Sequence, residues 1–136
     1  YIYALNLGKV VRQSTEDKVL IIGGGATLHE ALGAAEELKG QGINARVLDI
    51  FSIKPIDAKG IIKNAEESGK KIVTVEEHYP EGGIYEAVAG VIVNTDIKIW
   101  RLSVERVPGS AKPEEQMSIH HIDKHSIAAK VKEVLA

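Results

Sequence analysis

The chain has 136 residues, of which 44% are hydrophobic and 26% charged, as expected for one globular domain with a sizeable core. The net charge of -2 argues against a nucleic-acid binder, because the chain has no basic excess with which to neutralise phosphates. The lack of cysteine excludes disulfides and thiolate metal sites, and no apolar run approaches the roughly 20 residues of a membrane span.

Five strands are predicted along the chain. The first, Lys9 to Gln13, is a short β-branched run that ends in turn residues. Val19 to Ile22 is apolar without alternation, which is typical of a strand buried on both faces of a parallel sheet. The remaining strands are Ala45 to Ile50, Lys71 to Glu77 and Ile97 to Val104.

Apolar residues at helical spacing predict a helix after each of the last four strands. The first helix ends at Gly40 and Gly42, the second opens at Pro55 and Asp57, and the third follows Gly82 and Gly83. The apolar positions are Leu28, Ala31, Leu32, Ala35 and Leu38 in the first helix, Ile61, Ile62 and Ala65 in the second, Ile84, Ala87, Val88 and Val91 in the third, and Ile127, Val131, Val134 and Leu135 in the last.

This order predicts an α/β fold, namely a three-layer α/β/α sandwich around a five-stranded, mostly parallel sheet. The first strand is followed only by a short turn, so we expect it to run antiparallel at an edge. Val19 to Ile22 and Ile72 to Val75 should be the most buried strands. We expect residues 1–136 to form a single domain, and the start without methionine indicates a fragment of a longer chain.

The glycine turn in Val19 to Leu32, VLIIGGGATLHEAL, resembles the phosphate-binding turn of a dinucleotide-binding protein. Gly23 and Gly25 match two glycines of the Rossmann fingerprint, but Leu28 stands at the third position. Asp49 ends the next strand at about the distance of a ribose-binding acid. The match is incomplete, because the third glycine normally lets the helix pack closely against the strand.

A structural explanation of the same turn accounts for more residues. Thr27 is a good helix N-cap and Glu30 follows three positions later, which predicts a capping box. The glycines allow a tight turn from strand to helix. We therefore expect no dinucleotide to bind, and at most a weak anion site on the amides of Gly24, Gly25 and Thr27.

The second polar cluster, EEHYPEGG, lies at the carboxyl end of a predicted strand, where α/β folds place ligands. Glu76, Glu77 and His78 could act as acid and base, and a surface or interface loop is an equally good explanation. The candidate interface residues are Glu76, Glu77, His78, Tyr79, Gly82 and Gly83.

The histidine-rich stretch HHIDKH, His120 to His125, suggests a metal site at first sight. Adjacent histidines on a helix do not face the same way, and no acidic residue has clear ligand spacing. We therefore expect a solvated helix cap. Residue spacing alone points to no complete catalytic, cofactor or metal site, since G-x-S-x-G and H-E-x-x-H are both absent.

Three segments in order along nearly the whole chain resemble the carboxyl-terminal domain of transketolases: GGGATLHEALGAAEELKGQGINARVLDIFSIKPID, VTVEEHYPEGGIYEAV and RVPGSAKPEEQM. The likeness is greatest to animal-type transketolases, and related domains occur in archaeal split transketolases, deoxyxylulose phosphate synthases and pyruvate-type dehydrogenase β subunits. Two positions depart from the family, because Ala111 replaces a usual glycine and Tyr85 replaces a frequent one.

The resemblance implies that the glycine turn is structural. It implies a parent enzyme that transfers a two-carbon ketol unit between sugar phosphates, using thiamine diphosphate and a divalent metal, Mg or Ca, held between two earlier domains. This domain would bind no cofactor, carry no catalytic residue, and support a cytoplasmic homodimer or its regulation. No nucleic-acid or membrane partner is implied. The alternative is a free-standing Rossmann-like nucleotide-binding module, against which Leu28 argues.

Overall fold

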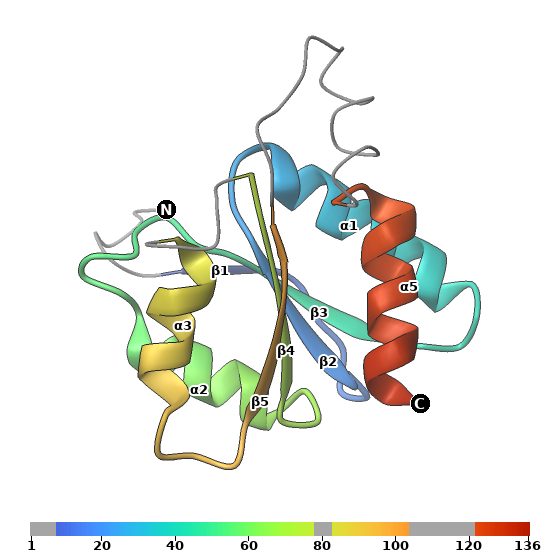
Figure 1. Cartoon of the computed structure of the whole chain (residues 1–136). Helices are drawn as coiled ribbons and strands as arrows, with labels where there is room; N and C mark the ends of the chain where they lie inside the picture. The colour runs from blue at the N-terminus through green and yellow to red at the C-terminus, as the bar shows by residue number, and fades with distance from the viewer. Residues whose placement is uncertain (1–7, 78–82, 104–121) are drawn as a thin grey trace, which may run out of the picture.

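The computed structural model describes residues 8–77, 83–103 and 122–136. Its strands are β1 (Lys9–Arg12), β2 (Val19–Gly23), β3 (Ala45–Asp49), β4 (Lys71–Glu76) and β5 (Lys98–Ser103). Its helices are α1 (Ala26–Lys39), α2 (Ala58–Glu66), α3 (Ile84–Ile92) and α5 (Lys124–Leu135). The sheet forms the middle layer, with α1 and α5 on one face and α2 and α3 on the other (Figure 1).

The five strands form one sheet in the order β1-β3-β2-β4-β5. β1 pairs antiparallel with β3, and the other neighbours are parallel. The predicted α/β sandwich with an antiparallel first strand at one edge is therefore confirmed. Among the described residues, none of the helices is long and apolar enough to cross a membrane.

The unbroken apolar strands are the core of the sheet, as predicted. In β2, Val19 and Ile21 face the cluster under α1 and α5, while Leu20 and Ile22 face the cluster under α2 and α3. All four side chains are fully buried, and so are those of residues 72–75 in β4. A strand covered on both sides has no solvent face, which explains why neither segment alternates between apolar and charged residues.

Candidate functional site

A cleft of about 480 Å³ opens at the carboxyl edge of the sheet. The chain leaves β2 for α1 on one face of the sheet and leaves the adjacent β4 for α3 on the other. The cleft therefore lies at the topological switch point, where α/β folds bind ligands. It is lined by the glycine turn (Gly24, Gly25), the segment after β3 (residues 50–53), and Glu76, Glu77, Gly83 and Ile84.

The cleft brings together residues from two predicted clusters, the glycine turn and the end of β4. The segment after β3 also contributes, which the sequence analysis missed. Phe51 and Ile53 in this segment are 47% and 38% exposed. Apolar side chains directly after a strand, where polar turn residues are common, are the signal that could have identified this wall.

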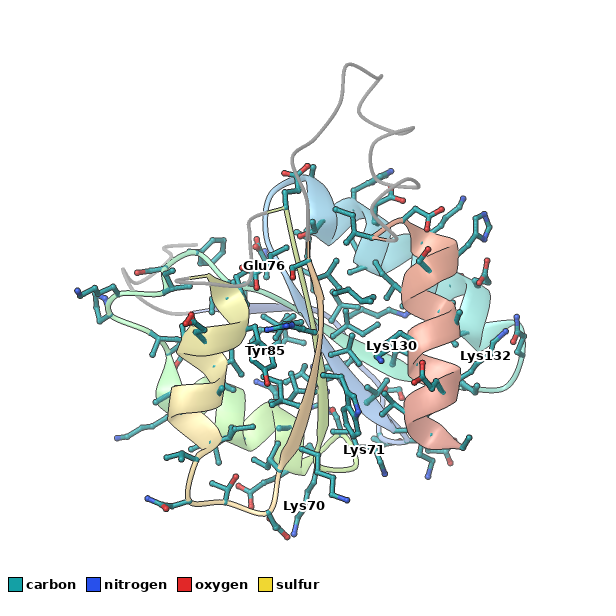
Figure 2. The ribbon with its side chains drawn as sticks, in the orientation of Figure 1. Lys70, Lys71, Glu76, Tyr85, Lys130 and Lys132 are labelled. Carbon is teal, nitrogen blue, oxygen red and sulfur yellow. The ribbon has the colours of Figure 1, made fainter. Side chains whose placement is uncertain are left out.

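Glu76 ends β4 and is 1% exposed (Figure 2). The backbone amide of Ile84 donates a hydrogen bond to its Oε1 at 2.6 Å, and the amide of Tyr85 donates to its Oε2 at 2.9 Å. The carboxylate therefore satisfies the first amides of α3 and places a negative charge at the positive end of that helix. Both oxygens of this candidate acid or base are engaged in holding the helix.

Gly83 directly precedes α3, and its lack of a side chain is required by the same contact. A Cβ atom at this position would collide with the carboxylate of Glu76. Tyr85, one of the two departures from the family pattern, is the second residue of α3. The Arg101 guanidinium carbon lies over its ring, 5.3 Å from the centroid, in a cation–π contact between β5 and α3.

The glycine turn after β2 is built from backbone conformation and close approach. Gly25 has a φ of 61°, in the left-handed region that favours glycine, and it is the N-cap of α1. A Cβ atom on Gly24 would lie 3.2 Å from the carbonyl oxygen of Ile50. The amide of Ile50 in turn donates to the carbonyl of Gly23 at 3.1 Å, which ties the turn to the end of β3.

Thr27 does not cap α1, so the predicted capping box is wrong. The helix begins at Ala26, two residues before the start that a Thr27 cap would give, because the positive φ of Gly25 already turns the chain. The buried Thr27 hydroxyl lies 2.8 Å from the Gly24 carbonyl and 3.0 Å from the Val75 carbonyl, and it accepts from the Gly24 amide at 3.1 Å. Thr27 thus fastens the turn to β4.

Glu30, the other half of the predicted box, acts on a different helix. Its Oε1 accepts a hydrogen bond of 2.9 Å from the backbone amide of Lys124, the first residue of α5. Thr27 and Glu30 have the i, i+3 spacing of a capping box, but each side chain binds a backbone group that is distant in sequence. Packing of α5 against α1 supplies the partner that a local rule could not predict.

Leu28 and Asp49, which were compared with the Rossmann fingerprint, both occupy structural positions in this fold. Leu28 is partly buried against the core cluster under α1 and α5. Asp49 ends β3 and is not among the residues that line the cleft. Partial burial raises the pKa of the Asp49 carboxyl, and the charge of Lys9 opposes that shift.

The helix-cap explanation of HHIDKH is confirmed for the part of the stretch that the structure describes. Asp123 is the N-cap of α5, and its Oδ1 accepts from the amide of Ser126 at 3.0 Å. His125 Nδ1 lies 2.6 Å from Glu37 Oε1 on α1. Within residues 8–77, 83–103 and 122–136, no group of three or more acidic or histidine side chains could hold a metal ion.

Comparison with known proteins decides the family. The model of the transketolase carboxyl-terminal domain matches residues 8–127. The chain belongs to this family. It is 50% identical to transketolase-like protein 2 of Mus musculus over 98% of the chain, and 48% identical to Homo sapiens transketolase over 96%. It covers 21% of each of these relatives, so the chain spans about a fifth of their length.

The transketolase domain also superposes on a solved structure, a split gene transketolase described as an inactive β4 tetramer. The TM-score is 0.87 at 31% identity, over 96% of this chain and 43% of that chain. This likeness agrees with the sheet order and layers described above. The candidate interface residues His78, Tyr79 and Gly82, the histidines His120 and His121, and Ala111 lie outside the described residues, so their roles stay predictions.

Proposed function

We propose that this domain is the carboxyl-terminal part of a transketolase, which transfers a two-carbon ketol unit between sugar phosphates. In this proposal thiamine diphosphate and its divalent metal, Mg or Ca, bind in earlier domains of a longer chain. The present domain serves assembly of the homodimer or its regulation. The observation that carries the proposal is the family match over residues 8–127.

The chemistry of the cleft supports a role outside catalysis. Glu76 is engaged by two backbone amides, and Glu77 lies beside it on the cleft wall. A diphosphate entering the cleft would therefore meet negative charge, although the start of α1 on the opposite wall favours anions. These residues do not fit thiamine diphosphate, and we assign no catalytic step to them.

The proposal is tested by replacing the corresponding domain of Homo sapiens transketolase with residues 8–136. We expect the chimera to form a dimer and to retain turnover, while the isolated chain with thiamine diphosphate and Mg²⁺ has none. Turnover by the isolated chain would contradict a non-catalytic role. Saturable binding of NAD to the isolated chain by calorimetry would instead support the nucleotide-binding alternative.

The same chimera tests the candidate interface loop. Because aromatic residues surrounded by polar ones are common at interface centres, Tyr79→Ala should weaken dimerisation more than it lowers turnover at saturating cofactor. Sedimentation at falling protein concentration, run beside a steady-state assay, separates the two effects. Glu16→Ala, in the turn between β1 and β2, is the control and should change neither.

A further inference from the structure

The outer margin of the sheet, at β5, is less covered on its α1/α5 face than the inner strands β2, β3 and β4. On this face α1 packs mainly over β3 and β2, and α5 packs against α1 and β4. Trp100 and Leu102 of β5 project onto this face, because they pack at the margin of its core cluster. Both are only partly buried. An apolar strip therefore remains beside α5.

Two lysines lie at one end of this strip. Lys71 of β4 and Lys98 of β5 are direct register partners, two positions before the partners Val73 and Trp100. Alternate residues of a strand share a face, so both lysines lie on the same face as Trp100. Like charges directly opposite each other destabilise a sheet. Neither lysine has an acidic partner within the described ranges, whereas the neighbouring Lys70 bonds to Asp96 at 2.7 Å.

A third lysine, Lys130 of α5, borders the strip from the helix. His125 marks the flank of α5 that contacts α1, because its Nδ1 lies 2.6 Å from Glu37 Oε1. Each helical residue is rotated by about 100°, which puts Lys130 on the other side of the buried stripe, toward β5. In Figure 2, Lys71 and Lys130 both lie between the ribbons of β5 and α5.

The charge of Lys130 is only weakly compensated. The acid nearest to it in the described chain is Glu133 of the same helix, whose Oε1 lies 3.5 Å from Nζ and whose side chain is 71% exposed. An ion pair at this distance with one well-exposed partner contributes little. The strip formed by Trp100, Leu102, Lys71, Lys98 and Lys130, hereafter the β5 strip, thus combines an apolar floor with three cations.

We propose that the β5 strip is a docking site for an extended acidic segment of a partner protein. In the part of the chain that the structure describes, the outer edge of β5 has no strand beside it, so its backbone groups could pair with an added strand. Side chains of such a strand alternate between faces. Those on the α1/α5 face would lie on Trp100 and bring carboxylates to Lys71 and Lys98.

Charge argues against a second copy of this chain as the occupant. Two β5 strands paired edge to edge would bring Lys98 and Arg101 of both copies together, with no acid in the strand to offset them. Lysines on an edge strand are a known device against self-pairing. The same cations attract an acidic strand, which is why we commit to that partner.

Trp100 is the only tryptophan in the chain, so its fluorescence reports directly on the strip. The probe is a short synthetic peptide of alternating glutamate and valine, and the control peptide has lysine in place of glutamate. We expect the acidic peptide alone to shift Trp100 emission to shorter wavelength in a saturable way. The apparent Kd should rise with salt, because the charges are partly exposed.

Two matched variants locate the binding. A chain with Lys71→Gln, Lys98→Gln and Lys130→Gln should bind the acidic peptide with a Kd about tenfold higher, since three exposed ion pairs are lost. A chain with Lys39→Gln, Lys54→Gln and Lys59→Gln loses the same charge at exposed positions elsewhere and should keep its Kd. Circular dichroism checks that both variants fold.

Three results would overturn the proposal. The first is no saturable binding of the acidic peptide, measured by Trp100 emission and by anisotropy of a labelled peptide. The second is an equal loss of affinity in both lysine variants, which would indicate a non-specific charge effect. The third is binding of tripolyphosphate in place of the peptide, which would assign the strip to a phosphate ligand.

Discussion

Two turns at the carboxyl edge of the sheet place glycines before a helix, yet they are built differently. After β2, Gly25 adopts a positive φ, and the neutral hydroxyl of Thr27 fastens the turn to β4. After β4, Gly83 has an extended backbone, and the carboxylate of Glu76 binds the first amides of α3. A glycine before a helix therefore indicates either a positive φ, as at Gly25, or a close approach, as at Gly83. The sequence alone does not distinguish these structural causes from a ligand-binding turn.

The largest expected effect comes from removing the internal anion. Glu76→Ala should lower the free energy of unfolding by about 3 kcal/mol, because it leaves two amides of α3 unsatisfied in a buried site. Urea denaturation measures the loss. Glu77→Ala, at the exposed neighbouring position, should change stability by less than about 0.5 kcal/mol. In the chimera, normal stability with lost turnover in Glu76→Ala would reverse our assignment and make this residue catalytic.

The glycine of the second turn gives the next effect. Gly83→Ala should destabilise the domain by about 2 kcal/mol, because the new Cβ pushes the Glu76 carboxylate away from the helix amides. Gly90→Ala, in α3 itself, is the matched control. Its Cβ meets no atom within 4 Å, so it should stabilise the domain by about 0.5–1 kcal/mol. Equal changes in stability at Gly83 and Gly90 would mean that helix propensity alone determines the effect of replacing glycine by alanine.

In the first turn, Thr27→Ala should cost about 1 kcal/mol through lost hydrogen bonds to the turn and to β4. Thr27→Ser keeps the hydroxyl and should cost less. Because Thr27 and Glu30 have different partners, Thr27→Ala and Glu30→Ala should be additive within about 0.5 kcal/mol in a double-mutant cycle. A clear coupling energy between the two positions would instead indicate that Thr27 and Glu30 interact with each other, as in the predicted capping box.

The smallest expected effect on stability concerns α5. Its N-cap, Asp123, accepts a hydrogen bond from the amide of Ser126, three residues along the chain. Partial burial opposes ionisation of Asp123, but hydrogen bonds from Ser126 and the nearby His125 outweigh it and lower its pKa. A lowered folded-state pKa gives stability that is present above the unfolded pKa of about 3.9 and is lost as pH falls through the folded value. Asp123→Asn keeps a capping acceptor, so stability near pH 7 should hardly change.

The effect of Asp123→Asn should appear at acidic pH, in the dependence of the unfolding midpoint on pH. Unfolding midpoints at about pH 7 and about pH 3 should differ less in Asp123→Asn than in the original chain, because the titrating cap is gone. Asp49→Asn is the control of opposite sign, since burial raises the pKa of Asp49. An unchanged acid slope in Asp123→Asn would show that its carboxylate is not coupled to folding.

Local sequence was sufficient for the frame of this domain. The unbroken apolar runs in β2 and β4 predicted strands covered on both sides, and the helical spacing of apolar residues predicted the four helices. Asp57 at the start of α2 also acts as predicted, accepting from the amide of Gly60 at 3.1 Å. Hydrophobic periodicity and a cap that binds an amide three residues away depend only on a short segment. They can therefore be predicted without knowing how the rest of the chain folds.

The partners of the polar side chains needed the folded molecule. From the sequence, Glu76 was predicted as a candidate acid or base with no bound partner. The amides that it binds come within reach only when α3 folds back over the sheet. Arg46 interrupts an apolar strand without explanation until Asp17, Asn64 and Glu67 are brought to it, at 2.9, 3.0 and 2.6 Å. A buried charge is tolerated only where several segments converge, and that convergence is a tertiary property.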